Sequence, residues 1–206
     1  MAKLRFYYGS MASAKTLRLL TTAYNFEERG IPFVVLKPST DTRDGNGVIA
    51  SRVGLKRDCV TIGLHDNILD SIKKYTELMS SSINCVDVPL KWILIDECQF
   101  LTEEQVEQLA EIVDTLNIDI MCFGLRTDFR SRLFPGSKRL FELADTIEEV
   151  KSSCACGNKT TINARFDDKG QLVLDGQQVL VGGDDKYKSI CRKCWNKIKH
   201  SQQNND

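Results

Sequence analysis

The chain has 206 residues, enough for one main domain with a packed core and one small additional module. Hydrophobic residues make up 42% of it and charged residues 27%, which is ordinary for a globular protein, and the formal net charge is zero. A neutral chain has no overall basic field for binding a nucleic-acid polymer. We find neither a signal peptide nor a membrane-spanning segment, so we expect a cytoplasmic protein.

Strand and helix patterns alternate through about residue 150 and predict an α/β domain with a mostly parallel sheet over residues 1–151. The elements expected in chain order are a strand at 4–8, a helix at 15–29, a strand at 33–36, a loop or hairpin within 38–58, a helix at 67–79, a strand at 92–95, a helix after Thr102 and a strand at 118–123. Thr102 and Gln105 have the spacing of a capping box at the start of the third helix.

The character of the sequence changes near Lys151. Short strands, turn residues and paired cysteines predict a small zinc-ribbon-like domain over residues 152–195. The polar residues that follow, 196–206, predict a disordered tail.

A phosphate-binding loop follows the first strand and opens the first helix, which indicates a P-loop (RecA-like) domain. It consists of Gly9, Ser10, Met11, Ala12, Ser13, Ala14, Lys15 and Thr16. Backbone N–H groups at such a helix start bind phosphate oxygens, Lys15 reaches the terminal phosphates of ATP, and Thr16 can hold Mg²⁺. The usual pattern has glycine where this chain has Ala14. If that position needs a positive φ, the methyl group costs about 1 kcal/mol, and we expect weaker, though not absent, nucleotide binding.

A second acidic motif follows the apolar run at 92–95, where the strand ends in Asp96 and Glu97. A phosphate loop needs a second acidic element, which we expect on a strand neighbouring the one before the loop. Both motifs stand at the carboxyl ends of their strands, the edge at which open α/β sheets bind ligands. Adjacent residues on an extended chain point to opposite sides, so the two carboxylates can have different tasks. Asp96 is the candidate for Mg²⁺ and Glu97 the candidate for general base. Glu97 alone could equally be a solvated or salt-bridged carboxylate.

Eight cysteines fall into two groups. Cys59, Cys85, Cys98 and Cys122 are scattered among apolar residues and are expected to pack as small hydrophobes. Cys154, Cys156, Cys191 and Cys194 form two close pairs that predict a structural Cys₄ zinc site. Disulfides would need an oxidising compartment, which nothing in the sequence indicates. A redox Cys-x-x-Cys is disfavoured because a second cysteine pair lies nearby. Four thiolate ligands leave no open position, so this metal should hold the fold and perform no chemistry.

These motifs together resemble the thymidine kinase family of the cellular and bacterial type. Besides the phosphate loop and the cysteine pairs, the segments that carry the resemblance are Asp41-Thr42-Arg43, residues 51–55, Asp96-Glu97-Cys98-Gln99-Phe100, residues 124–130 and residues 182–187. The resemblance implies transfer of the ATP γ-phosphate to the 5′-hydroxyl of thymidine, with deoxyuridine as a possible second substrate. It also implies a homotetramer and feedback inhibition by thymidine triphosphate.

The resemblance assigns further site residues. Glu97 matches the base, Lys15 and Arg43 match groups that offset phosphate charge, and Cys98 and Gln99 match positions beside ATP. A loop called the lasso, here residues 167–187, closes over the nucleoside. The positions implied to contact thymidine are Met11, Phe100, Leu125, Phe129, Phe134, Asn163, Val179, Leu180, Val181, Gly182 and Tyr187.

Two other functions compete with this interpretation. Nucleic-acid-dependent ATPases also use an Asp-Glu-x-Gln motif, but such motors generally need a second motor domain, for which this chain has no room. A non-catalytic zinc-ribbon binding module would explain the last 50 or so residues and leave the phosphate loop and Glu97 unexplained.

Overall fold

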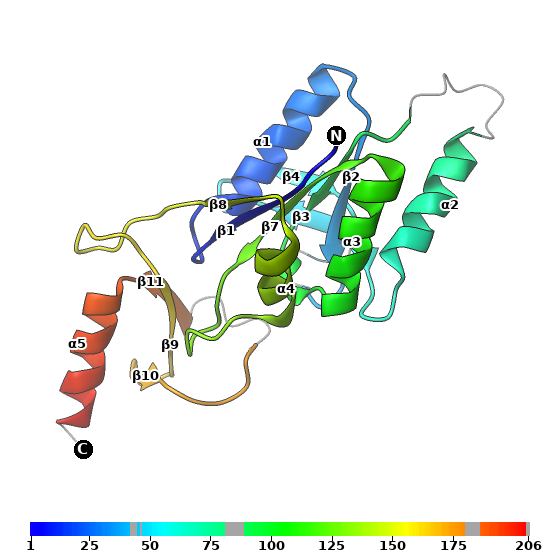
Figure 1. Cartoon of the computed structure of the whole chain (residues 1–206). Helices are drawn as coiled ribbons and strands as arrows, with labels where there is room; N and C mark the ends of the chain where they lie inside the picture. Colours follow the sequence, from blue (N-terminus) through cyan, green and yellow to red (C-terminus); the bar gives the residue numbers. More distant parts are fainter. Residues whose placement is uncertain (42–44, 46, 81–88, 180–185, 205–206) are drawn as a thin grey trace.

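The computed structural model of the chain describes residues 1–41, 45, 47–80, 89–179 and 186–204. The strands of the main sheet are β1 Leu4–Gly9, β2 Phe33–Pro38, β5 Val60–Ile62, β6 Trp92–Ile95, β7 Asp119–Leu125 and β8 Thr146–Glu149. They form one six-stranded sheet in the order β5-β2-β6-β7-β1-β8, and every pairing in it is parallel (Figure 1). This confirms the predicted α/β class.

Helices cover both faces of this sheet. α1 (Lys15–Glu28) lies on one face, and α2 (Ile68–Ser80), α3 (Glu103–Leu116) and α4 (Pro135–Leu143) lie on the other (Figure 1). Along β6, Ile93 and Ile95 pack in the core on the α3 side, whereas Leu94 packs in the core on the α1 side. All three are fully buried, which explains the continuous apolar run of this strand.

Most elements lie where the sequence places them. α3 begins with the predicted capping box: Thr102 Oγ1 accepts from Gln105 N at 3.1 Å, and Gln105 Oε1 accepts from Thr102 N at 3.1 Å. Within residues 38–58 the structure has the short antiparallel hairpin of β3 (Val48–Ala50) and β4 (Lys56–Asp58).

α4 and β8 were not predicted. α4 opens with Pro135-Gly136, a pair that normally indicates a turn and that hid the amphipathic residues after it. β8 is an edge strand whose residues are mostly exposed, so it lacks the apolar alternation of a half-buried strand.

The C-terminal module, residues 152–203, packs beside the carboxyl end of β1 (Figure 1). Its antiparallel sheet has the order β10-β9-β11, with bounds β9 Ile162–Phe166, β10 Leu172–Val173 and β11 Tyr187–Ile190, and α5 (Arg192–Gln203) follows. A small core of Ile162, Ala164 and Leu172 packs against Trp195 and Ile198 of α5.

The prediction of a disordered tail from residue 196 is wrong up to Gln203, where α5 ends. Docking stabilises this polar helix. Gln202 Oε1 accepts from Leu172 N at 2.8 Å, and Gln202 Nε2 donates to Leu172 O at 3.3 Å.

None of the described helices combines the length and the apolar character that a membrane-spanning helix needs.

Candidate functional site

A cavity of about 330 Å³ opens at the carboxyl edge of the main sheet. Its walls are residues 11–17 of the phosphate loop and α1, residues 50–53 of the β3–β4 hairpin, Asp96 and Glu97 after β6, and Leu125 at the end of β7. The two motifs that the sequence singled out therefore meet in one cavity. The hairpin residues, among them Arg52, had no role in the sequence reasoning beyond their place in a matching segment.

Three positions of the phosphate loop have constrained backbone. A Cβ on Gly9 would lie 2.4 Å from Ser13 Oγ and 2.5 Å from Val150 O, so glycine is required there. Ala12 and Ala14 are left-handed, with φ of 57° and 61°. Ala14, which stands where glycine is usual, therefore has the positive φ for which a methyl group is strained. Ala14 is also the N-cap of α1 and supplies no side-chain cap to the N–H groups there.

Lys15 is buried beneath this loop, at 7% exposure. Its Nζ donates to Ser10 O at 2.7 Å and lies 3.3 Å from Ser13 Oγ. The loop carbonyl therefore holds the ammonium group at the wall of the cavity, where it attracts an anion.

Thr16 and Asp96 are in contact, although β1, which precedes the phosphate loop, and β6, which precedes Asp96, are not neighbours in the sheet. β7 lies between β1 and β6, so the expectation of adjacent strands is wrong. Thr16 Oγ1 nonetheless donates to Asp96 Oδ2 at 3.0 Å. Burial, and secondarily the charge of Glu97, raises the pKa of Asp96 to about 7. A hydroxyl and a buried carboxylate side by side offer the hard oxygen ligands that suit Mg²⁺.

Glu97 does not continue the strand. Its φ of 50° and ψ of 38° are left-handed, so the picture of two carboxylates on an extended chain is wrong. It begins the short 3₁₀ helix η1 (Cys98–Phe100), and its carboxylate accepts a hydrogen bond from Gln99 Nε2. Gln99 Oε1 accepts from Leu125 N at 2.9 Å, and Gly124 lets η1 pack closely, since a Cβ there would lie 2.6 Å from Cys98 Sγ. The carboxylate of Glu97 is thereby fixed at the cavity wall.

Of the residues implied to contact thymidine, Met11 and Leu125 line the cavity. Phe100 is half-buried and packs edge to face on the buried Phe134, with ring centroids 5.8 Å apart. Asn163 is buried, and its Oδ1 accepts from Met11 N at 2.7 Å.

The lasso is only partly described. Val179 is exposed, Tyr187 is half-buried at the start of β11, and Arg43, Leu180, Val181 and Gly182 lie outside the described residues. The contact of these residues, and of the aromatic set, with a nucleoside stays a prediction.

One arginine that the sequence reasoning missed organises the described part of the lasso. The guanidinium carbon of Arg165 lies 3.7 Å from the ring centroid of the buried Phe129. Its NH1 donates to Gln177 O at 2.8 Å and its NH2 to Asp175 O at 3.2 Å, and Gly176 leaves space for this approach. An arginine within a strand carries no sequence signal for such a role.

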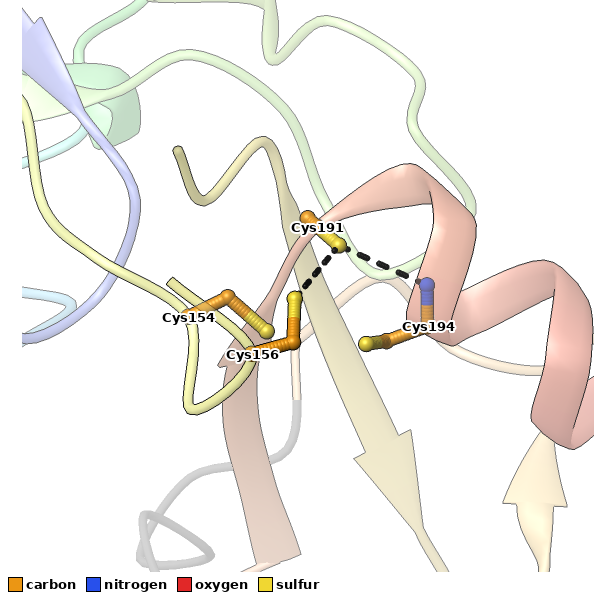
Figure 2. Close-up of side chains that lie close together, drawn as sticks. All are labelled: Cys154, Cys156, Cys191 and Cys194. Carbon is orange, nitrogen blue, oxygen red and sulfur yellow. Dashed lines mark hydrogen bonds between the residues drawn. The ribbon is translucent and has the colours of Figure 1, made fainter. Parts of the chain in front are cut away.

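The four cysteines of the two pairs come together in the C-terminal module. Cys154 and Cys156 lie in the loop before β9, Cys191 is the N-cap of α5, and Cys194 lies in its first turn (Figure 2). Their sulfur atoms are all within 4.8 Å of one another, and Figure 2 shows them pointing toward one another. Tetrahedral thiolate ligands around zinc are about 3.8 Å apart, and Sγ of Cys156 and Cys191 are 3.5 Å apart. The donor set and its spacing fit a closed structural zinc site.

The thiols are also tuned by their neighbours. Hydrogen bonds from the backbone and side chain of Asn158 lower the pKa of Cys156 to about 6, while hydrogen bonds to Cys156 and Cys191 raise the pKa of Cys194 to about 12. Within the quartet Cys156 is therefore readily available as the thiolate that metals bind.

Comparison with known proteins shows the family of the chain. The family model described as thymidine kinase matches residues 2–195. A thymidine kinase of Rhodopirellula baltica is 42% identical over 192 residues, covering 93% of this chain and 87% of the relative. Those of Shewanella oneidensis (42% over 193 residues; 94% and 96% covered) and Legionella pneumophila (44% over 192 residues; 93% and 88% covered) are similarly close.

Among solved structures, a Pif1 helicase from Candida albicans matches at a TM-score of 0.42 and 17% identity, over 73% of this chain and 36% of its own, which is too distant to support a conclusion. The family match, by contrast, spans nearly the whole chain and includes the phosphate loop, the acidic motif and the cysteine quartet. The chain belongs to the thymidine kinase family.

Proposed function

We propose that the chain transfers the γ-phosphate of ATP to the 5′-hydroxyl of thymidine, giving thymidine monophosphate and ADP. The observation that carries this proposal is the convergence of Lys15, the Thr16–Asp96 pair and Glu97 on one cavity in a chain of this family. Phosphoryl transfer depends mainly on positioning and on electrostatic stabilisation, and these are the groups that supply both.

Each residue has a separate task in this reaction. Glu97, held by Gln99, accepts the proton of the attacking hydroxyl as general base. Lys15 sets its positive charge against the transferring phosphoryl group, and the N–H groups at the start of α1 bind phosphate oxygens. Thr16 and Asp96 would hold Mg²⁺, which when bound neutralises charge on the β and γ phosphates.

The nucleoside side is proposed from the family resemblance. Met11 and Leu125 form the part of its wall that lies in the cavity, and the lasso closes over the base. Arg43, which lies outside the described residues, is assigned by the same resemblance to offset phosphate charge. A homotetramer, feedback inhibition by thymidine triphosphate and acceptance of deoxyuridine are further proposals of the same origin. Structural zinc is proposed from the four converging thiols of the quartet, and a cytoplasmic location from the sequence.

One coupled assay tests the proposal. With ATP and Mg²⁺, ADP release from a panel of natural nucleosides is expected with thymidine, to a lesser extent with deoxyuridine, and not with purine nucleosides. ATP turnover that needs DNA and ignores thymidine would instead support a nucleic-acid-dependent ATPase.

Ala14→Gly is expected to lower the KM for ATP. Glycine adopts the left-handed backbone of position 14 without strain, so the loop conformation that presents its N–H groups costs less. A difference of about 1 kcal/mol corresponds to about a fivefold change in affinity. Ser131→Gly is the matched control, because Ser131 also has a positive φ, of 62°, but is not part of the phosphate loop. Equal KM values for the unmodified chain and Ala14→Gly would contradict this expectation.

A further inference from the structure

The peptide groups on both sides of Met11 are held by side chains of the C-terminal module. Met11 N donates to Asn163 Oδ1 at 2.7 Å, and Met11 O accepts from Ser189 Oγ at 2.5 Å. Asn163 lies on β9 and Ser189 on β11, where the two are direct cross-strand partners. One pair of neighbouring side chains therefore satisfies both backbone groups of a phosphate-loop residue more than 150 positions away in the chain.

Both side chains are themselves held in place. Asn163 is 4% exposed, and its Nδ2 donates to Thr127 O at 3.1 Å, which fixes which amide atom faces Met11. Ser189 stands two residues before Cys191, whose sulfur belongs to the cysteine quartet. The orientation of the Asn163 amide is therefore set by the main domain, and Ser189 is close in the chain to the cysteine quartet.

A second contact of the same kind reaches the residue before Met11. Ser10 Oγ lies 2.8 Å from Ser152 Oγ and 2.8 Å from Thr160 Oγ1, the residues that flank the loop carrying Cys154 and Cys156. The carbonyl of Ser10 is also the acceptor for Lys15 Nζ. The C-terminal module thus reaches the residue that orients the phosphate-binding ammonium group.

The loop needs such support because of its own sequence. Ala12 and Ala14 both have positive φ, and a left-handed backbone costs of the order of 1–2 kcal/mol for each residue that is not glycine. Backbone of this kind persists only where its surroundings over-determine it. The hydrogen bonds to Met11 come immediately before Ala12 and supply that constraint from outside the loop.

We propose that the C-terminal module positions the phosphate loop for ATP, with Asn163 and Ser189 as positioning residues that hold the two peptide groups of Met11. The module is then more than the base of the lasso, and it acts on the ATP side of the reaction as well as on the thymidine side. The proposal rests on the proposed ATP site in the loop, and it reassigns Asn163 from the thymidine pocket to the phosphate loop.

The test measures MgATP binding to the full chain by titration calorimetry, together with the KM values for ATP and thymidine. Ser189→Ala removes the donor to Met11 O, and Asn163→Ala removes the acceptor for Met11 N–H. Each is expected to weaken ATP binding and raise the ATP KM about fivefold to tenfold, because each leaves a part-buried peptide group of Met11 unpaired, with the thymidine KM changed less than about twofold. Ser189→Ala is the cleaner variant, because Asn163→Ala also removes the donor to Thr127 O.

Matched variants separate positioning from general damage. Ser189→Thr keeps the hydroxyl donor and should restore most of the ATP affinity lost in Ser189→Ala. Ser201→Ala removes a serine hydroxyl of the same module that donates to Lys197 O within α5, and should change neither KM.

Two results would overturn the proposal. One is a rise in the thymidine KM with unchanged ATP binding, which would return Asn163 to the nucleoside pocket. The other is unchanged ATP binding in folded Ser189→Ala. The calorimetric arm needs no turnover, so it stays decisive even if the chain phosphorylates no thymidine, which would refute the proposed function separately.

Discussion

Glu97→Gln is expected to lower kcat about 10²- to 10⁴-fold, the usual contribution of a positioned general base. The substitution keeps an oxygen that can accept from Gln99 Nε2, so the left-handed turn into η1 is retained. ATP and thymidine should still bind, because the phosphate loop and the rest of the cavity wall are unchanged. Steady-state kinetics and direct binding of each substrate check this result.

The control for Glu97→Gln is Glu148→Gln. Glu148 lies on the edge strand β8, and the substitution removes its carboxylate from an exposed ion pair with Arg18. Its kcat should be that of the unmodified chain, since exposed ion pairs contribute little. A kcat within about tenfold of the unmodified value for Glu97→Gln would show that another group takes the proton.

Cys191→Ser is expected to remove the zinc and loosen the C-terminal module. Serine is a good N-cap and can accept from Cys194 N as Cys191 Sγ does, so the start of α5 is kept and only the metal ligand is lost. Structural zinc contributes apparent binding free energies of about 10–16 kcal/mol to small domains, so its loss should lower the Tm clearly. The thymidine KM should rise because the lasso is anchored on this module.

Metal analysis of the purified chain, thermal unfolding and kinetics together test the zinc prediction. Cys59→Ser is the control, since Cys59 is half-buried in the main domain and outside the quartet. Chelation of zinc from the unmodified chain should reproduce the effects of Cys191→Ser. If the chain loses its zinc and keeps its Tm and both KM values, the metal does not hold the module.

Much of the main domain was predictable because its signals are local. The apolar run of β6 and the capping box of α3 are encoded in a few consecutive residues, and both lie where the sequence places them. α4, β8 and the end of α5 were not predictable in this way. Their residues are polar or open with turn signals, and packing against distant residues, such as Gln202 on Leu172, stabilises them.

The candidate site divides along the same line. The phosphate loop, Asp96, Glu97 and the cysteine quartet are recognisable from residue type and spacing alone. The roles of Arg165 and Asn163 are not recognisable in this way, because each depends on the backbone groups that the fold brings beside the side chain. Arg165 contacts residues 175 and 177 of the lasso, and Asn163 contacts Met11.

The sequence by itself determined the chemistry of this protein: an anion-binding loop, a carboxylate pair and four metal ligands, because these depend on functional groups at short spacing. Only the tertiary structure decided how they are joined. β7 separates the strands of the two motifs, yet Thr16 reaches Asp96, and Ala14 proves to be left-handed. The physical reason is that strand order, φ and hydrogen-bond partners are set by contacts between residues far apart in the chain, as between Met11 and the pair Asn163 and Ser189.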